Sequence, residues 1–224
     1  MCGRFSLHEH PNVIALQFGI SETIDFAPKY NLAPTSAIIA LHGAPRAMVR
    51  WRWGLVPYWD KQPDKARGLH NARADTIDVK PAFRDAWRQR RCIIPASGFY
   101  EWKSIAGRKQ PYYIHSAGGE LLAFAGIYQH SLGAAGEFTG CAVITTEPNE
   151  LMREIHDRMP VILDSEDYGA WLDPKQNDLG KLKELLKPCV SECLLAHPVS
   201  TRVNNARYDD PSCVQPVASE ELSF

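Results

Sequence analysis

Short runs of apolar, β-branched and aromatic residues, interrupted by glycine and proline, make up much of this chain. Such runs predict strands, because these side chains pack well on a pleated, half-buried surface. Residues 37–41 and 47–53 form two runs around a turn at 43–45 and predict a strand pair. Further strands are predicted at residues 92–94, 99–103, 112–115, 121–128, 138–145 and 193–199.

Helices are predicted in four places, at residues 12–18, 80–88, 148–156 and 181–187. Pro81 and Pro148 favour helix starts, because the backbone torsion of proline suits the first helical turn. No repeat, low-complexity tract or linker divides the chain. Many strands with a few interspersed helices predict an α+β fold. We expect one domain over residues 1–224, with a strand-rich core that is a curled sheet or barrel-like.

The overall charge limits how the chain can bind nucleic acid. Its formal net charge is −1, so it does not coat DNA through bulk charge, and DNA binding would need a local basic patch. No apolar stretch approaches the length that spans a bilayer, and the first ten residues, MCGRFSLHEH, have no apolar signal core. We therefore expect a cytoplasmic protein with no membrane partner.

The cysteine pattern favours reduced thiols over disulfides. The six cysteines are Cys2, Cys92, Cys141, Cys189, Cys193 and Cys213, and none belongs to a CxxC pair. Cys189, Cys193 and His197 are evenly spaced, but the spacing is not that of a usual zinc site and a fourth ligand is missing. We predict no metal and buried thiols at these positions.

The start of the chain, Met1-Cys2-Gly3, carries the first candidate chemistry. A small second residue favours removal of Met1, which leaves Cys2 with a free α-amino group beside its thiol. The pKa of an α-amino group is roughly 7.7–8.0, so a useful fraction is nucleophilic near neutral pH. The amine can form a Schiff base with an aldehyde, and the thiol can close onto that carbon to give a thiazolidine. The residue types alone leave open that Cys2 is a small residue at a frayed end.

Nine segments, in a fixed order along nearly the whole chain, carry a resemblance to a known family. They are MCGRF (1–5), YNLAPT (30–35), WGLVPYW (53–59), NARADT (71–76), PAFRDAW (81–87), RCIIPASGFYEWK (91–103), FAGIY (124–128), IHDRMPVIL (155–163) and HPVSTRVNN (197–205). The chain resembles the SRAP family, the SOS-response-associated peptidases or abasic-site processing proteins. The resemblance implies the SRAP fold and autocatalytic removal of Met1. It also implies an N-terminal cysteine that crosslinks to abasic sites in single-stranded DNA.

The resemblance also assigns catalytic roles. It implies that Cys2 is the nucleophile, that Asn71 orients the N-terminus and the opened sugar, and that Glu101 and His156 move protons. Each helper has another interpretation on residue type alone. Asn71 is a common turn residue, and His156 is favoured as a cation at a helix C-terminus. Glu101 would be a solvated strand carboxylate paired with Lys103.

Cations and aromatic side chains in the matching segments are the candidates for DNA contact. The cations are Arg4, Arg73, Arg84 and Arg158, and the candidates for stacking or wedging are Tyr58, Trp59 and Trp102. Pro34 is expected to shape the groove wall beside the nucleotide. Some relatives carry two tryptophans where this chain has Tyr58 and Trp59, which leaves the identity of the wedge open.

Other basic and aromatic residues have ordinary structural interpretations. Arg88, Arg90 and Arg91 extend a basic stretch, although a helix can solvate such charges. Trp51 and Trp53 are expected to lie in the core.

The resulting hypothesis is covalent capture of a ring-opened abasic sugar by the amine and thiol of Cys2. His156 would assist ring opening, and Glu101 would move the proton of imine formation. The expected partner is single-stranded DNA containing abasic sites, because there the sugar is reached without unstacking. No metal or organic cofactor is required. We expect a monomer that associates with the nucleoid when bound to DNA, where the crosslink would protect the strand.

Two other classes of protein remain as alternatives. An N-terminal-nucleophile thiol amidohydrolase or peptidase also begins with a processed cysteine, and it would show amide hydrolysis with an acyl-enzyme burst. A non-catalytic single-strand-binding module would use the arginines and aromatic residues alone. Its binding would be reversed by salt and would not depend on Cys2.

Overall fold

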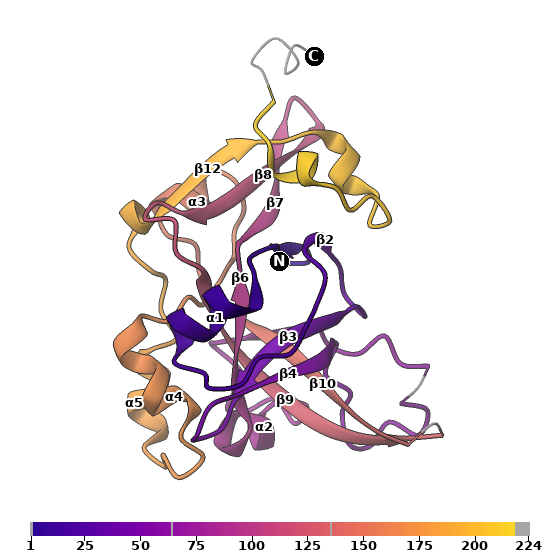
Figure 1. Cartoon of the computed structure of the whole chain (residues 1–224), viewed down its shortest axis with the longest axis vertical. Coiled ribbons are helices and arrows are strands. Elements are labelled where there is room, and N and C mark those ends of the chain that lie inside the picture. The colour runs from indigo at the N-terminus through magenta and orange to yellow at the C-terminus, as the bar shows by residue number, and fades with distance from the viewer. Residues whose placement is uncertain (1, 64, 135, 218–224) are drawn as a thin grey trace.

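Five strands close into a barrel in the computed structural model, which describes residues 2–63, 65–134 and 136–217. They are β3 (Ala37–His42), β4 (Ala47–Trp53), β6 (Arg91–Ala96), β9 (Leu122–Gly133) and β10 (Gly136–Thr146), in the lower half of Figure 1. The pairing runs β10-β4-β3-β6-β9, and β9 pairs again with β10, so the ring is complete. The β4–β10 pair is parallel and the others are antiparallel. Closure removes the free edges that an open sheet would expose.

A second sheet, of five antiparallel strands, lies above the barrel in Figure 1. In order, its strands are β12 (Leu194–Pro198), β8 (Arg108–Ser116), β7 (Gly98–Ile105), β1 (Phe5–Leu7) and β2 (Lys29–Leu32). Only Ser97 separates β6 from β7, so the chain passes directly from the barrel into this sheet. On β1, the Phe5 ring packs edge-on against Trp53 and Phe124 of the barrel, with centroid distances of 4.9 and 6.0 Å. These contacts hold the start of the chain between the two sheets.

Two short strands extend the barrel at the carboxyl end of β10. β5 (Asn71–Arg73) pairs with β10 in parallel and places Arg73 opposite Thr145. β11 (Met159–Pro160) pairs with β10 antiparallel and places Pro160 opposite Thr145. Because both strands register on the same residue, the segments around 71–73 and 156–160 meet there.

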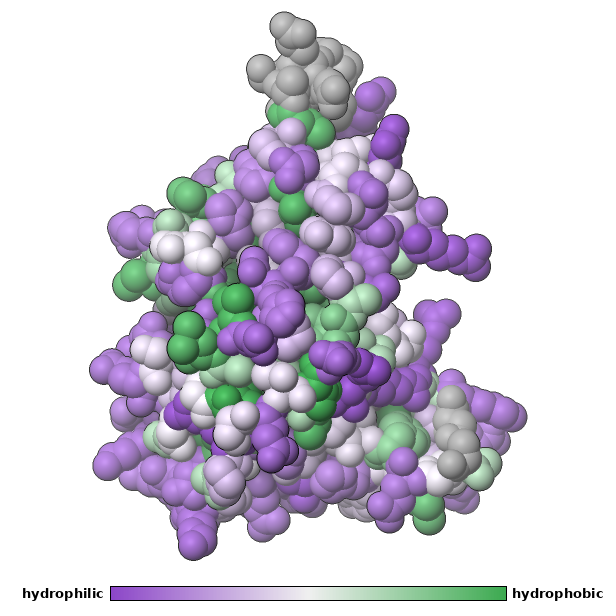
Figure 2. Space-filling model, viewed as in Figure 1, coloured by the Kyte–Doolittle hydropathy of each residue, from purple (hydrophilic) through white to green (hydrophobic). Residues whose placement is uncertain are grey.

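The helices are short and lie outside the strands. They are α1 (Pro11–Phe18), α2 (Arg84–Gln89), α3 (Glu150–Arg153), α4 (Tyr168–Leu172) and α5 (Leu179–Glu184). Single turns of 3₁₀ helix are η1 (Ser165–Asp167), η2 (Ser191–Cys193), η3 (Thr201–Asn204) and η4 (Pro211–Val214). None of the described helices is long and apolar enough to cross a bilayer. Figure 2 shows a face covered mainly by hydrophilic residues, with small groups of hydrophobic ones.

The α+β class and the strand-rich, barrel-like core are confirmed, and all eight strands predicted from the sequence are present. Two predicted helices, at residues 80–88 and 148–156, were too long, and the one at 181–187 was displaced, because α5 begins at Leu179. Residues 80–83 form a turn that precedes α2, and α5 ends at Glu184. Pro148 lies outside α3, because the side chain of Asn149 caps this helix by accepting from the Met152 amide at 2.9 Å.

Several expectations about individual side chains need correction. Trp53 is fully buried as expected, but Trp51 is only partly buried and packs on Tyr128 with a centroid distance of 4.4 Å. Arg91 is buried, and its guanidinium donates to backbone carbonyls, among them those of Trp87, Arg88, Trp171 and Asp173. It therefore belongs to the protein interior and not to a basic surface. Burying such a cation is tolerated because these hydrogen bonds replace its hydration.

The cysteines form no disulfides, and they differ in burial. All six cysteines are free, but Cys189 and Cys193 are only half-buried, so the prediction of buried thiols was wrong for these two. His197 donates from Nε2 to the Val214 carbonyl at 2.9 Å. Among the described residues, no group of three or more histidine, cysteine or acidic side chains is arranged to hold a metal ion.

Candidate active site

Cys2 lies in the interior of the protein, at the junction of the two sheets. It is fully buried, and the carbonyl of its neighbour Arg4 accepts from the Tyr100 amide of β7 at 3.0 Å. The Cys2 carbonyl accepts from Nδ2 of Asn71 on β5 at 2.8 Å. The start of the chain is therefore held from both sides, and the interpretation of Cys2 as part of a frayed end was wrong.

Asn71 is positioned by the pairing of β5 with β10, where it lies opposite Val143. While its Nδ2 holds the Cys2 carbonyl, its Oδ1 is buried and has no hydrogen-bond partner within the described part of the chain. An unsatisfied buried acceptor costs about 1–3 kcal/mol, so it is rarely retained without a use. This oxygen is available to accept from an amine or a sugar hydroxyl next to Cys2.

Glu101 lies on β7 with only 3% of its side chain exposed. Burial raises the pKa of this carboxyl to about 7, because a low-dielectric environment disfavours the charged form. Lys103 does not pair with it, since its ammonium lies 3.8 Å from Glu154 Oε2. The alternative of a solvated carboxylate paired with Lys103 was therefore wrong. A carboxyl with a pKa near 7 can both give and take a proton at neutral pH.

The pKa of the Cys2 thiol is also shifted by this buried environment. Burial raises its pKa, and the nearby carboxylate of Glu101 raises it further. The resting thiol is consequently protonated, and it needs a base before it can act as a nucleophile. Glu101 is the carboxylate close enough to influence it.

His156 completes this group from the segment that follows α3. Its amide continues the turn by donating to the Met152 carbonyl at 2.7 Å, and its Nε2 lies 3.7 Å from Glu101 Oε2. The Arg158 amide donates to its Nδ1 at 3.0 Å, which places the proton of the neutral ring on Nε2, facing Glu101. Burial is the main cause that lowers the pKa of His156, so the neutral ring is favoured at pH 7. The carboxylate of Asp157, whose Oδ1 lies 2.9 Å from Nδ1, raises the pKa of His156 and so partly offsets the effect of burial.

The structure thus brings together the four catalytic candidates, Cys2, Asn71, Glu101 and His156. It adds two of the arginine candidates at the edge of this group. Arg73 follows Asn71 on β5, and Arg158 follows His156 and donates from Nη2 to the Thr145 carbonyl at 2.6 Å. Thr145 was not singled out from the sequence, because an anchoring backbone carbonyl has no sequence signal.

Arg4 and Trp102 form a second group of DNA-contact candidates. The Arg4 guanidinium lies 5.9 Å from the centre of the Trp102 ring and donates to Asn31 Oδ1 at 2.7 Å. Its other bond, to the Val203 carbonyl at 2.6 Å, ties it to η3. Asn31 was overlooked in the sequence, although it lies in the YNLAPT segment. Its buried amide fixes Arg4 by donating to the carbonyls of Val203, Asn205 and Tyr208.

The other DNA-contact candidates lie farther out. Tyr58 and Trp59 are 70% and 49% exposed in the loop after β4, and their rings meet edge-on at 4.9 Å. Pro34 is partly exposed beside β3. Arg84 begins α2, and its Nε lies 3.6 Å from Asp85 Oδ1. Figure 1 shows this helix at the end of the barrel away from the labelled N-terminus. The structure therefore does not bring Arg84 to the candidate site.

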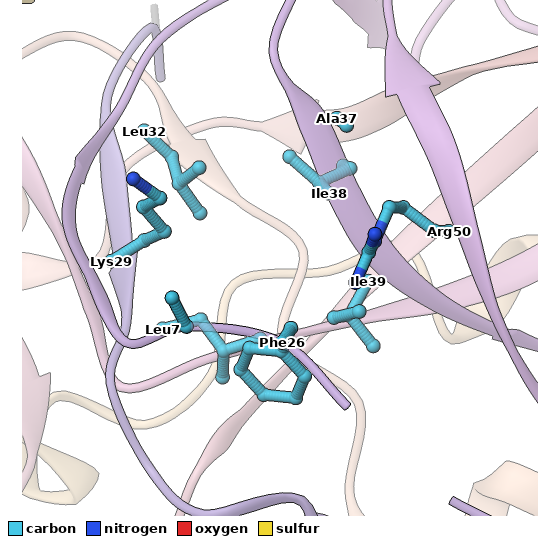
Figure 3. A pocket seen from close by; sticks show the side chains of 9 residues that line it. Leu7, Phe26, Lys29, Leu32, Ala37, Ile38, Ile39 and Arg50 are labelled. Atoms are coloured by element: carbon cyan, nitrogen blue, oxygen red, sulfur yellow. The ribbon is translucent and has the colours of Figure 1, made fainter. Parts of the chain in front are cut away.

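A separate apolar hollow of about 260 Å³ lies between β1, β2 and the barrel strands β3 and β4 (Figure 3). Leu7, Phe26, Leu32 and Ile39 are among the apolar side chains that line it. Its two cations are already engaged, because Lys29 pairs with Asp209 at 2.8 Å and Arg50 donates to the Asp25 carbonyl. None of the four catalytic candidates lines this hollow, so it is distinct from the candidate active site.

A closed barrel carrying a second sheet, with a cysteine near the start of the chain facing a buried acid–base pair, defines the class of protein. The chain belongs to the SRAP family: the family model described as SOS response associated peptidase (SRAP) matches residues 1–206. It is 40% identical over 222 residues to the abasic site processing protein YoqW of Bacillus subtilis, covering 96% of this chain and 99% of YoqW. It is 41% identical over 214 residues to YoaM of the same organism, covering 92% and 94% of the two chains.

The fold is also similar to that of a protein whose structure has been solved. A protein of Bacteroides thetaiotaomicron superposes with a TM-score of 0.87 at 28% sequence identity. The match covers 97% of this chain and all of the other.

Proposed function

We propose that this protein captures abasic sites in single-stranded DNA by forming a thiazolidine between Cys2 and the ring-opened sugar. The single observation that carries the proposal is the placement of Cys2 against Asn71 and beside the buried pair of Glu101 and His156. The relatives YoqW and YoaM are named abasic site processing proteins, which supports an abasic sugar as the aldehyde.

Removal of Met1 is the first step of the proposed sequence, and Met1 itself lies outside the described residues. Hydrolysis of the Met1–Cys2 peptide bond consumes one water and releases methionine, leaving the α-amine of Cys2 free. The family description includes the word peptidase, which supports self-processing through the Cys2 thiol. In this proposed step Glu101 takes the thiol proton and passes it to the amine nitrogen that leaves the Met1 carbonyl.

The crosslink itself follows from the aminothiol. The Cys2 amine adds to C1 of the open-chain sugar, and loss of one water gives an imine. The thiol then adds across the carbon–nitrogen double bond, its sulfur bonding to C1 and its proton ending on nitrogen. His156 assists ring opening by moving a proton at the sugar oxygen, and Glu101 takes the thiol proton and returns it. Asn71 Oδ1 orients the amine and a sugar hydroxyl.

The proposed product protects the strand from cleavage during replication and repair. Its reversal takes up one water and restores free Cys2 and the abasic aldehyde. A lyase-like activity is proposed beside the crosslinking. We propose that the protein acts as a monomer in the cytoplasm and joins the nucleoid when it is bound to DNA. We propose that Arg4, Arg73, Arg158 and Trp102 hold the strand around Cys2, and that Pro34, Tyr58 and Trp59 contact it farther along. Their positions around Cys2 and their exposure support this proposal.

A denaturing gel tests the proposal directly. The wild-type protein is incubated with a single-stranded oligonucleotide that carries one abasic site, and we expect a heat-stable adduct of reduced mobility. The matched oligonucleotide carries tetrahydrofuran at the same position, which has no aldehyde, and should give no adduct. Binding that heat and salt reverse completely would favour the single-strand-binding module. Hydrolysis of glutamine with an acyl-enzyme burst would favour the amidohydrolase.

A further inference from the structure

A second hollow, of about 470 Å³, lies at the arginine edge of the candidate active site. It is lined by three cations, Arg73, Arg158 and Lys183, together with Ala74, Asp75, Thr146, Glu147 and Leu186. Two of the cations come from segments that hold catalytic candidates, and the third comes from α5. The hollow therefore connects the proposed reaction centre with a helix to which the sequence assigned no role.

The two arginines meet for a reason built into the strands. Arg73 lies two residues after Asn71 on β5, so both side chains leave the same face of that strand. Arg158 lies two residues after His156 and is fixed by its bond to the Thr145 carbonyl. Because Arg73 is paired with Thr145, both arginines reach the same point of β10. An anion bound by both arginines would contact residues that lie two positions after Asn71 and two positions after His156.

The arginines retain donors that no described residue uses. Arg73 gives Nε and Nη2 to Asp75, at 3.1 and 2.7 Å, while Arg158 Nε is buried without a hydrogen-bond partner. Burial, and then the positive charge of Arg73, lower the pKa of Arg158. Two adjacent cations with an unsatisfied buried donor favour an anion that accepts from both, as a phosphate group does.

Lys183 extends this arrangement across the hollow. In the free protein its ammonium lies 2.6 Å from Asp78 Oδ2, and its side chain is 38% exposed. Asp75, Asp78 and Glu147 balance the cations while no ligand is bound. The lysine side chain can leave a surface carboxylate for a phosphate, because a solvent-accessible ion pair of this kind contributes little to stability.

We propose that the hollow binds the phosphodiester backbone of the single strand next to the abasic nucleotide, with Lys183 contacting a phosphate beyond those held by Arg73 and Arg158. The strand then leaves the reaction centre over α5. This inference rests on the proposed function, since it assumes that the DNA reaches Cys2. It adds α5 to the DNA-contact surface and gives the strand a direction on the protein.

The test is non-covalent binding of a fluorescent single-stranded oligonucleotide without an abasic site, measured by anisotropy over a range of salt concentrations. Lys183→Gln is compared with Lys181→Gln, a matched control two residues away on α5. The Lys181 side chain is 78% exposed, lies 3.9 Å from Asp178 and is absent from the hollow. We expect Lys183→Gln to raise Kd about fivefold and to reduce the slope of log Kd against log salt by about 0.7, as for one lost phosphate contact on a single strand. Lys181→Gln should match the wild type.

Two outcomes would overturn the inference. One is equal Kd and equal salt slopes for the two lysine variants. The other is weakening of the same size in Asp78→Asn, which would mean that Lys183 acts only through its ion pair; the inference expects this variant to bind DNA at least as tightly as the wild type. The failure of the proposed function is read separately, from the absence of a covalent adduct in the wild type.

Discussion

Replacing Cys2 with alanine is expected to abolish the heat-stable adduct with abasic DNA. Alanine is also small, so Met1 can still be removed and an α-amine remains, but no thiol is left to close the thiazolidine. The reversible imine should persist and be trapped by borohydride, which reduces it to a stable amine. The measurement is a denaturing gel, with and without borohydride, of Cys2→Ala on an abasic oligonucleotide.

Cys193→Ala is the matched control for this substitution. Cys193 is a half-buried free thiol of η2, and its sulfur donates to the Val190 carbonyl at 2.9 Å. It belongs to no part of the candidate active site, so the variant should form the adduct as the wild type does. A heat-stable adduct of Cys2→Ala without borohydride would contradict the assignment of Cys2 as the thiol that closes the ring.

Replacing Glu101 with glutamine is expected to slow crosslinking about a hundredfold, the lower end of the range for loss of a general acid–base group. Burial raises the pKa of Glu101 to about 7, so the basic carboxylate form grows as the pH rises from about 6 to 8. The wild-type rate should therefore rise through pH 7. In Glu101→Gln this rise should disappear, leaving only the titration of the α-amine near pH 8. Single-turnover crosslinking between pH 5.5 and 8.5 measures both effects.

Lys103→Gln provides the control on the same face of β7. Lys103 lies two residues from Glu101 and pairs with Glu154, so its removal changes a nearby charge without touching the acid–base pair. Its rate and pH profile should follow the wild type. If Glu101→Gln kept the wild-type rate and the rise through pH 7, Glu101 would not be the base.

The long strands of the fold could be predicted from the sequence, because each carries a continuous apolar or β-favouring run. The short strands could not be. β1 and β5 have three residues each, and β5 (Asn71–Arg73) has a polar residue at both ends. β1 forms because it pairs with β7, and β5 forms because it pairs with β10. These partners are distant in the sequence, so a local hydrophobic pattern does not reveal the pairing.

In the candidate site, too, the sequence indicates some features, whereas others depend on how the chain packs. The ordered segments named Cys2, Asn71, Glu101 and His156 as one set, and the structure places these residues near one another. Their catalytic roles stay predictions. Burial could not be predicted from these segments, and it decides the behaviour of Glu101. A glutamate between a tyrosine and a tryptophan can lie on a solvent-exposed face of a strand or in the protein interior. Only the packing of the second sheet on the barrel excludes water from this carboxyl and raises its pKa.

Surface positions were the least predictable. Arg84 lies in a matching segment but on a helix at the far end of the barrel, whereas Lys183 lies in no matching segment and lines the hollow beside Arg158. Charge on a surface helix gives no indication in the sequence of which way the helix will face, because that depends on how its buried residues pack.

The intact mass of the purified protein, before and after incubation with abasic single-stranded DNA, tests the central claim most directly. We expect the free protein to lack the mass of one methionine residue. The crosslinked species should have the mass of this shortened protein plus the oligonucleotide, less one water. A protein that keeps Met1 and still forms the adduct, or one that loses Met1 and gains no mass from abasic DNA, would contradict Cys2 as an N-terminal aminothiol that captures the abasic aldehyde.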